Sequence, residues 1–176
     1  MLKRFPESQA ILQVYAVIAV MLSGWTVTAF LWKLSAWLLI LNMGEILTVF
    51  SYGMVNNLVE GLIVLLLLLT FCVLLPPRIL RDDFAVRGAV LAVCLIGSLM
   101  AFVGLHMQFG TEPGGRLLIT LFEVLIIMAV FLGFSPKFPF VHSAVQSISD
   151  RLIVFLFILV PLFVIFLVYV IFRNIA

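Results

Sequence analysis

The sequence predicts an all-α integral membrane protein, a single domain over residues 1–176 in which about five transmembrane helices form a bundle. Of its residues, 65% are hydrophobic and only 10% are charged, whereas about a quarter of an ordinary soluble domain is charged. So few charged side chains cannot cover the surface of a water-soluble fold. Several apolar runs also reach the length that spans a bilayer, about 20 residues. We therefore expect lipid, and not water, to surround most of the chain.

The first predicted span covers residues 11–31 and follows a basic N-terminal segment that contains Lys3 and Arg4. Its apolar run is longer than the hydrophobic region of a secretory signal, which is about 7 to 15 residues. No small-residue cleavage site precedes polar mature sequence. These features predict a signal anchor that is not cleaved.

Four further spans are predicted, at residues 58–75, 88–105, 117–134 and 152–172. Pro76 and Pro77 end the first of these, because proline lacks an amide donor and disfavours a helical conformation in the residue before it. Turns rich in proline and glycine, at 112–115 and 135–139, bound the 117–134 span. Pro161 lies near the middle of the last span and predicts a kink there.

The segment 34–57 is apolar but carries polar residues at intervals of three and four, namely Asn42, Glu45, Thr48, Tyr52 and Asn56. This spacing places them on one face of a helix. An amphipathic or re-entrant helix at the headgroup interface would have this pattern, and so would a sixth span that packs its polar face against other helices. Trp25, Trp32 and Trp37 flank Lys33, which is typical of the interfacial zone.

The distribution of basic residues predicts the topology, because cytoplasmic loops carry an excess of Lys and Arg. Five spans with a cytoplasmic N-terminus place seven basic residues inside and three outside, whereas six spans give at best six against four. We therefore expect the N-terminus in the cytoplasm and the C-terminus outside. The inside set is Lys3, Arg4, Arg78, Arg81, Arg87, Lys137 and Arg151, and the outside set is Lys33, Arg116 and Arg173.

Several function classes are disfavoured. A net charge of +2 from scattered residues does not suggest a nucleic-acid surface. Cys72 and Cys94 lie in apolar runs without CxxC spacing, and His106 and His142 are expected at different depths, so neither a metal site nor a haem is indicated. The sequence contains no GxSxG, HExxH or P-loop motif. We expect no catalysis and no cofactor.

Carboxylates inside the membrane are the main candidates for function, because a charge at the bilayer centre costs about 2.5 to 3.5 kcal/mol on insertion scales. Glu123 lies within the 117–134 span, and if Glu45, Glu60 and His106 converged with it they would form a cation or proton site. Each residue also has a simpler interpretation. Glu123 would be protonated and hydrogen-bonded, Glu60 would cap a helix, and Glu45 would face headgroups or water.

Two other sets of residues are candidates for contacts with partners. The 88–105 span carries small residues at spacings of four and three, which let helix backbones approach closely: Gly97, Ala101 and Gly104. The loop before it carries basic residues that either dock onto anionic lipid or a partner protein, or only fix the topology: Arg78, Arg81 and Arg87.

The sequence therefore favours a noncatalytic integral membrane subunit of a larger complex, with a structural or assembly role. Its loops are too short for a soluble domain, which usually needs about 50 residues or more. The expected partners are membrane lipids and other membrane subunits or further copies of the chain, and not nucleic acid. The alternative is a small oligomeric transporter or channel that handles a cation or proton with its intramembrane Glu residues.

Overall fold

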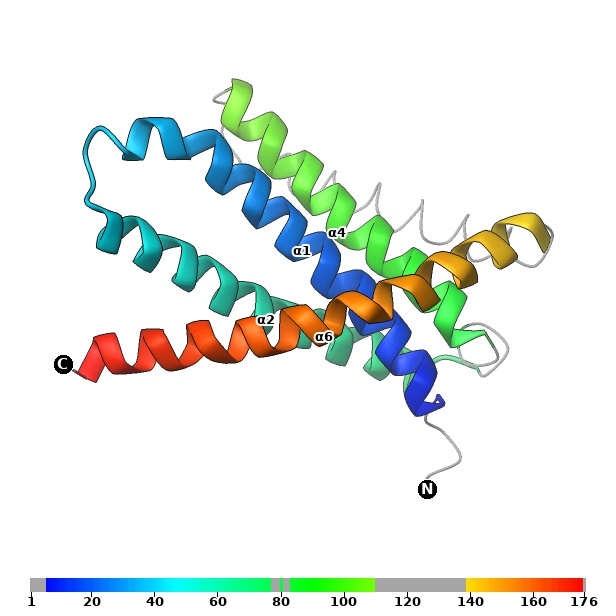
Figure 1. Cartoon of the computed structure of the whole chain (residues 1–176). Coiled ribbons are helices and arrows are strands. Elements are labelled where there is room, and N and C mark those ends of the chain that lie inside the picture. Colours follow the sequence, from blue (N-terminus) through cyan, green and yellow to red (C-terminus); the bar gives the residue numbers. More distant parts are fainter. Residues whose placement is uncertain (1–5, 77–79, 81–82, 110–138, 176) are drawn as a thin grey trace.

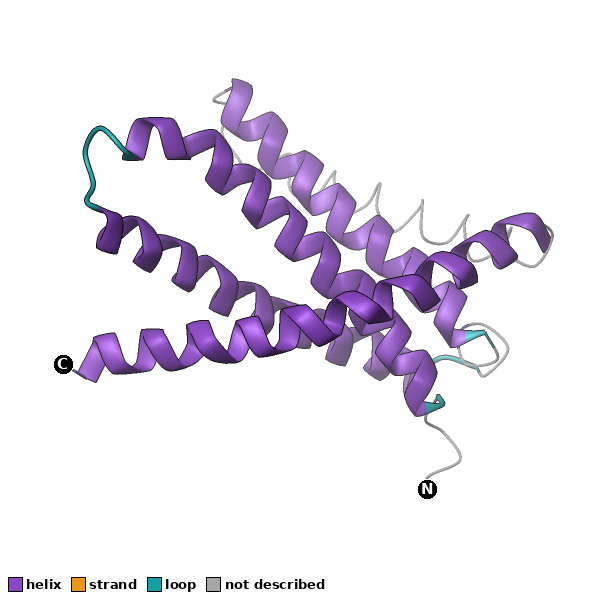
Figure 2. Ribbon diagram, viewed as in Figure 1, coloured by secondary structure: helices purple, strands orange, loops and turns teal. Residues whose placement is uncertain are grey.

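The computed structural model describes residues 6–76, 80, 83–109 and 139–175, and every regular element in these ranges is an α-helix. The helices are α1 (Ser8–Trp37), α2 (Met43–Leu74), α4 (Phe84–Phe109) and α6 (Pro139–Ile175), shown in Figures 1 and 2. Each contains a stretch that is long and apolar enough to cross a membrane. The expected all-helical architecture is confirmed, and in the described residues four helices, rather than about five, are long and apolar enough to span a membrane. The predicted span 117–134 lies outside those residues.

Helix α2 differs from the prediction, because it runs without a break through the expected boundary between 34–57 and 58–75. Its start is fixed by a capping box, in which the Glu45 amide donates to Asn42 Oδ1 and the Asn42 amide donates to Glu45 Oε2, both at 2.9 Å. Helix α1 continues to Trp37. The segment 34–57 is therefore the end of α1, a short loop and the first half of α2, and not a separate interfacial helix.

Helix α1 packs against each of the other three described helices and so lies at their centre. It runs parallel to α4, because Val14 lies beside Gly88 near one end and Trp25 lies beside Gly104 near the other. The added Cβ of an alanine at Gly88 would lie 3.0 Å from a Val14 methyl group, so glycine is what lets these two helices approach. This contact sets the spacing of α1 and α4.

Helix α2 is antiparallel to α1, whereas α6 is parallel to α1. The Thr26 hydroxyl of α1 donates to Asn57 Oδ1 of α2 at 2.8 Å, whereas Gly61, further along α2, packs against Ile18, which is nearer the start of α1. Gln13, also near the start of α1, bonds to Asp150 in the first half of α6. The N-terminal end of the bundle is defined here as the end where α1, α4 and α6 begin, and Figure 1 shows the described chain ends at opposite ends.

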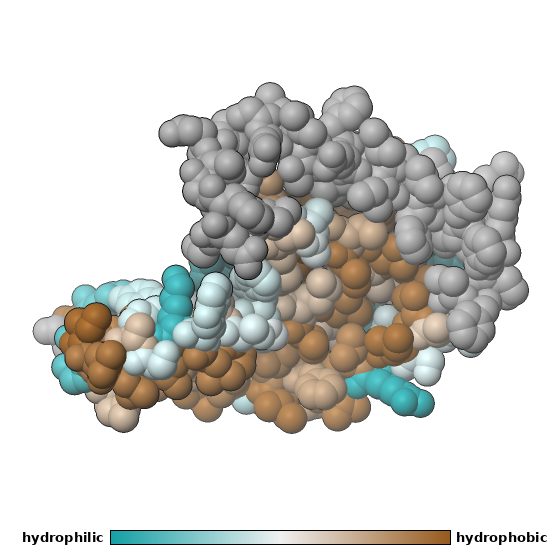
Figure 3. Space-filling model, turned by 90° about the horizontal axis from the view of Figure 1, so that it is seen from above, coloured by the Kyte–Doolittle hydropathy of each residue, from teal (hydrophilic) through white to brown (hydrophobic). Residues whose placement is uncertain are grey.

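Two clusters of buried apolar side chains hold the bundle together. The first joins α1, α2 and α4 and includes Val14, Ile18, Leu22, Leu68, Phe84, Leu91 and Ile96. The second joins α1, α2 and α6 and consists of Ala16, Ala19, Met54, Leu156 and Phe163, where two alanines of α1 leave room for the Phe163 ring. The outer faces remain apolar and exposed, and Figure 3 shows apolar side chains over much of the described part of one face. This surface is what lipid or a partner protein would cover.

Candidate functional site

The two carboxylates of α2 that were predicted to share an intramembrane site do not lie close to each other. Glu45 and Glu60 lie on this one helix, about 22 Å apart along its axis at 1.5 Å per residue. Glu45 is held in the cap, and Glu60 accepts a hydrogen bond from Asn56 Nδ2 at 2.6 Å in the middle of α2, so Glu60 does not cap a helix. Glu123 lies outside the described residues, as does the side chain of His106 in α4.

The predicted small-residue face of α4 contributes one contact among the described helices. A Cβ at Gly104 would lie 3.8 Å from the Trp25 ring of α1, whereas no described atom lies within 4 Å of a Cβ at Gly97. Ala101 is exposed. Only Gly104 therefore packs against α1.

Of the three basic residues proposed for docking, Arg78 and Arg81 lie outside the described residues. The Arg87 side chain is only 10% exposed, and its Nη2 lies 3.5 Å from Asp83 Oδ2. Arg87 belongs to the first turn of α4, and its charge is directed to Asp83, the residue directly before this helix. The sequence left open whether this arginine docks onto lipid or a partner or only fixes the topology, and in the structure it makes a local ion pair.

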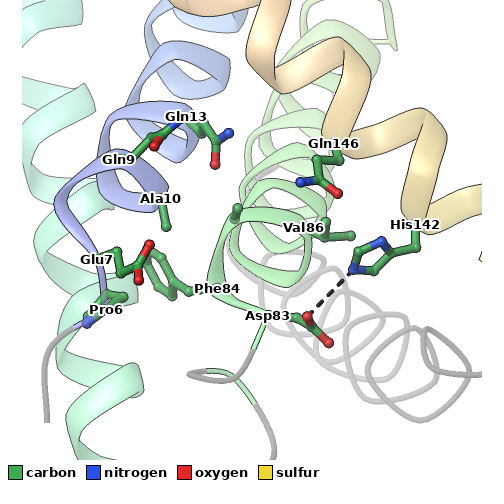
Figure 4. A pocket seen from close by; sticks show the side chains of 11 residues that line it. Pro6, Glu7, Gln9, Ala10, Gln13, Asp83, Phe84, Val86, His142 and Gln146 are labelled. Atoms are coloured by element: carbon green, nitrogen blue, oxygen red, sulfur yellow. Dashed lines mark ion pairs between the residues drawn. The ribbon is translucent and has the colours of Figure 1, made fainter. Parts of the chain in front are cut away.

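A cleft with a volume of about 520 Å³ lies at the N-terminal end of the bundle, between α1, α4 and α6. Figure 4 shows how these three elements surround it. Ala10, Phe84 and Val86 supply apolar wall. The polar side chains that line it are Glu7, Gln9, Gln13, Asp83, His142 and Gln146.

Asp83 connects α4 to α6 at this cleft. Its Oδ1 lies 3.5 Å from His142 Nε2, the pair joined by the dashed line in Figure 4, while its other oxygen faces Arg87. The backbone carbonyl of Asp83 also accepts from the Arg87 amide at 2.9 Å, which begins α4. Asp83 thus begins α4 with its backbone carbonyl and reaches α6 with its side chain.

Gln13 contributes an acceptor from α1. It is only 6% exposed, and its Nε2 donates to Asp150 Oδ1 on α6. A carboxylate only accepts hydrogen bonds, so this contact fixes the amide orientation and leaves Oε1 directed away from Asp150. Figure 4 shows the Gln13 side chain pointing from α1 into the cleft.

The sequence interpretation did not single out Asp83 or the glutamines. A periodic signal was present, because Gln9 and Gln13 are four residues apart, as are His142 and Gln146. Residues four apart share one face of a helix. What the spacing does not give is that the two faces meet.

A second polar network joins α2 and α6 at the opposite end, so the stripe of 34–57 packs partly against another helix. Arg173 donates to the Thr48 hydroxyl, and Tyr169 Oη lies 3.1 Å from the same oxygen. The Thr48 proton is committed to the Gly44 carbonyl at 2.6 Å, so Tyr169 is the donor to Thr48. This network uses one residue of the predicted stripe, and Tyr52, which donates to Asn174 Oδ1 at 2.7 Å, adds another.

Comparison with known proteins finds no match to this chain among family models, curated protein sequences or solved structures. The cleft, the polar network and the outer apolar faces are therefore the basis for the function proposed below.

Proposed function

We propose that this chain is a noncatalytic integral membrane subunit that binds another membrane protein through the outer face of α6. The observation that carries the proposal is a stripe of large apolar residues around Pro161. Their spacing of three, four or seven residues places them on adjacent positions of one helix face. They are between 62% and 77% exposed: Val154, Phe157, Ile158, Ile165 and Phe172.

Pro161 leaves one backbone carbonyl on this face in need of a hydrogen-bond donor. Because proline has no N–H, the carbonyl of Phe157 lacks its helical donor. Both residues are exposed, so the missing bond lies on the stripe. Lipid tails cover apolar side chains but supply no donor, and an unsatisfied carbonyl in hydrocarbon costs several kcal/mol. A neighbouring membrane helix would cover the apolar side chains, and a polar side chain on it would donate to the Phe157 carbonyl.

The proposal includes a topology of five crossings with the N-terminal end of the bundle in the cytoplasm. Helix α4 ends at the opposite end and α6 begins at the N-terminal end. The fifth crossing of the proposal is the predicted span 117–134, which lies outside the described residues. Arg87 and Arg151 lie towards the N-terminal end, and Arg173 lies at the opposite end, which agrees with the predicted charge bias.

A photo-reactive amino acid tests the outer face of α6. Incorporated at Phe157, benzoylphenylalanine should give a discrete crosslinked product with another membrane protein in native membranes, which mass spectrometry identifies. Leu156 is the matched control, because it is the next residue in the chain and is 5% exposed. Crosslinks to lipid alone, or only to a second copy of this chain, would refute the role as a subunit of a larger complex.

Cysteine labelling tests the topology. In a chain whose Cys72 and Cys94 are replaced by alanine, Leu39→Cys places a thiol in the exposed loop between α1 and α2. A membrane-impermeant maleimide should label this position in intact cells. Labelling only after the membrane is opened would contradict the orientation.

A further inference from the structure

We propose that the outer face of α2 binds a neighbouring membrane helix that carries a lysine or an arginine near its centre, and that this basic side chain pairs with Glu60. This face is separate from the outer face of α6, so the proposal goes beyond the subunit contact described above and is tested independently of it. Three observations support it: the depth of Glu60 in the bundle, its exposure, and the positions of the basic residues of this chain.

Glu60 lies near the middle of the bundle along its length. Asn57, three residues before it on α2, accepts a hydrogen bond from Thr26, and Gly61, directly after it, packs against Ile18. These two residues of α1 lie on either side of the middle of its predicted span. The hydrocarbon core of a bilayer is about 30 Å thick, so a residue at this depth lies about 15 Å from the headgroups on each side. A glutamate side chain does not extend that far.

Glu60 is exposed, and it belongs to a face of α2 that is otherwise mostly apolar. Asn56 and Ile63 lie one turn away on the same side of the helix, and Leu67 lies two turns away. Ile63 is 58% exposed and Leu67 is 42% exposed. Asn56 is also exposed, and its Nδ2 donates to Glu60 Oε1 at 2.6 Å. A polar pair is therefore placed in the middle of a surface that lipid tails or another helix would cover.

Lipid tails are an unfavourable cover for this pair. Ionisable side chains inside the membrane are costly, and they almost always pair with another group or face a water-filled cavity. The described hydrogen bond of Glu60 comes from Asn56, a neutral amide of the same helix, which does not balance a negative charge. A carboxylate can accept several hydrogen bonds, so it can bind a cation in addition to this amide.

The sequence supplies no basic residue at the depth of Glu60. All ten Lys and Arg residues lie outside the five predicted spans and outside the segment 34–57. A second copy of the chain would therefore bring another carboxylate to this face and no cation. A different membrane protein with a Lys or Arg inside a span would supply the missing charge. Both side chains have several N–H donors, enough for the Glu60 carboxylate and the amide oxygen of Asn56 together.

Synthetic transmembrane helices test the pairing directly. Each is a helix of leucine and alanine, about 20 residues long, with lysine, glutamine or leucine at its centre. The helix and the purified protein carry a pair of fluorophores, and their association in phosphatidylcholine vesicles is measured by energy transfer. We expect the helix with central lysine to associate about fivefold more tightly than the other two, in line with polar contacts between membrane helices. A helix with its lysine moved close to one end should lose this preference.

The variant Glu60→Gln keeps the shape of the side chain and removes its charge, so it should abolish the preference for central lysine. Glu7→Gln is the matched control, because it makes the same change at an exposed carboxylate directly before α1, at the end of the bundle, and the preference should persist in it. A preference that is absent in the unmodified protein, persists in Glu60→Gln or is lost equally in Glu7→Gln would overturn the proposal.

Two other occupants of the face give different results in the same vesicles. Equal binding of the helices with central lysine and central glutamine would indicate neutral hydrogen bonding and would contradict the charge pair. Energy transfer between two differently labelled copies of the chain that depends on Glu60, with no preference for central lysine, would assign the face to self-association and would also overturn the proposal.

In native membranes, benzoylphenylalanine at Ile63 tests the same face. The crosslinked segment of the partner should contain a Lys or Arg inside a membrane span, and the product should be lost when Glu60→Gln is introduced as well. A crosslinked span without a basic residue, or a product that is unchanged by Glu60→Gln, would refute the pairing. The photo-reactive residue at Phe157 samples the outer face of α6, so its result decides the proposed subunit contact separately.

Discussion

Replacing Thr26 by valine should destabilise the pairing of α1 and α2 at its centre. The Thr26 hydroxyl donates to Asn57 Oδ1 at 2.8 Å, and this bond joins two helices inside the bundle. Valine keeps the size and branching of threonine, so the change removes the hydrogen bond with little change in packing. It leaves Asn57 without its described donor.

The expected cost follows from the burial of Asn57, which is 5% exposed. Its amide nitrogen has only a weak contact with Met54 Sδ at 3.8 Å. A buried polar group that loses its partner costs about 1–3 kcal/mol, so Thr26→Val should lower the free energy of unfolding by that amount. The double variant Thr26→Val/Asn57→Leu should cost less than the sum of the single variants. Interhelical hydrogen bonds in membranes show coupling of about 0.6 to 1.7 kcal/mol.

Unfolding in mixed micelles of mild detergent and dodecyl sulfate, followed by circular dichroism, measures all four members of this cycle. Thr28→Val is the matched control, because the Thr28 hydroxyl donates at 2.8 Å to the Gly24 carbonyl of its own helix. Its loss should not affect the α1–α2 contact. A coupling indistinguishable from zero, or an equal effect of Thr28→Val, would refute the assignment of this bond as a determinant of helix pairing.

Two further predictions concern other contacts between helices. Gly88→Leu should cost about 1–3 kcal/mol through overpacking against Val14, whereas Gly97→Leu should cost clearly less, and equal losses in the same unfolding assay would contradict the α1–α4 geometry. Tyr169→Phe removes the donor to Thr48 and should cost about 0.6 kcal/mol, the mean for such bonds, while an unchanged midpoint would show that the α2–α6 network does not contribute.

The sequence alone predicted helices that are long and apolar enough to span a membrane, and it predicted the positions of most of them. Hydropathy carries this information because it measures how long a stretch of chain avoids water. It was insufficient for the start of α2. A polar stripe is the same in sequence whether it faces headgroups or another helix, and here Thr48 and Tyr52 contact α6. The capping pair Asn42 and Glu45 could nevertheless have been predicted, because an Asn followed three residues later by a Glu resembles the sequence pattern of a helix start.

The cleft could not be predicted from the sequence, for a different reason. Gln13 and Asp150 are 137 residues apart in the chain, and the pair of His142 and Asp83 joins two helices. Periodicity identifies the face of one helix on which a residue lies, but not which faces meet. The parallel arrangement of α1, α4 and α6, set by contacts such as that of Val14 with Gly88, brings these polar ends together.

The interior of the bundle also bears on the transport alternative. Between α1, α2 and α6, the rings of Phe30 and Phe50 lie 4.7 Å apart, and those of Phe50 and Phe166 lie 5.4 Å apart, so aromatic side chains pack together where these three helices meet. Glu45 and Glu60 are exposed on α2 and do not line this interior. A carboxylate on the outer surface at the middle of an apolar helix is unfavourable against lipid. Glu60 is exposed, and its described hydrogen bond comes from Asn56 of the same helix.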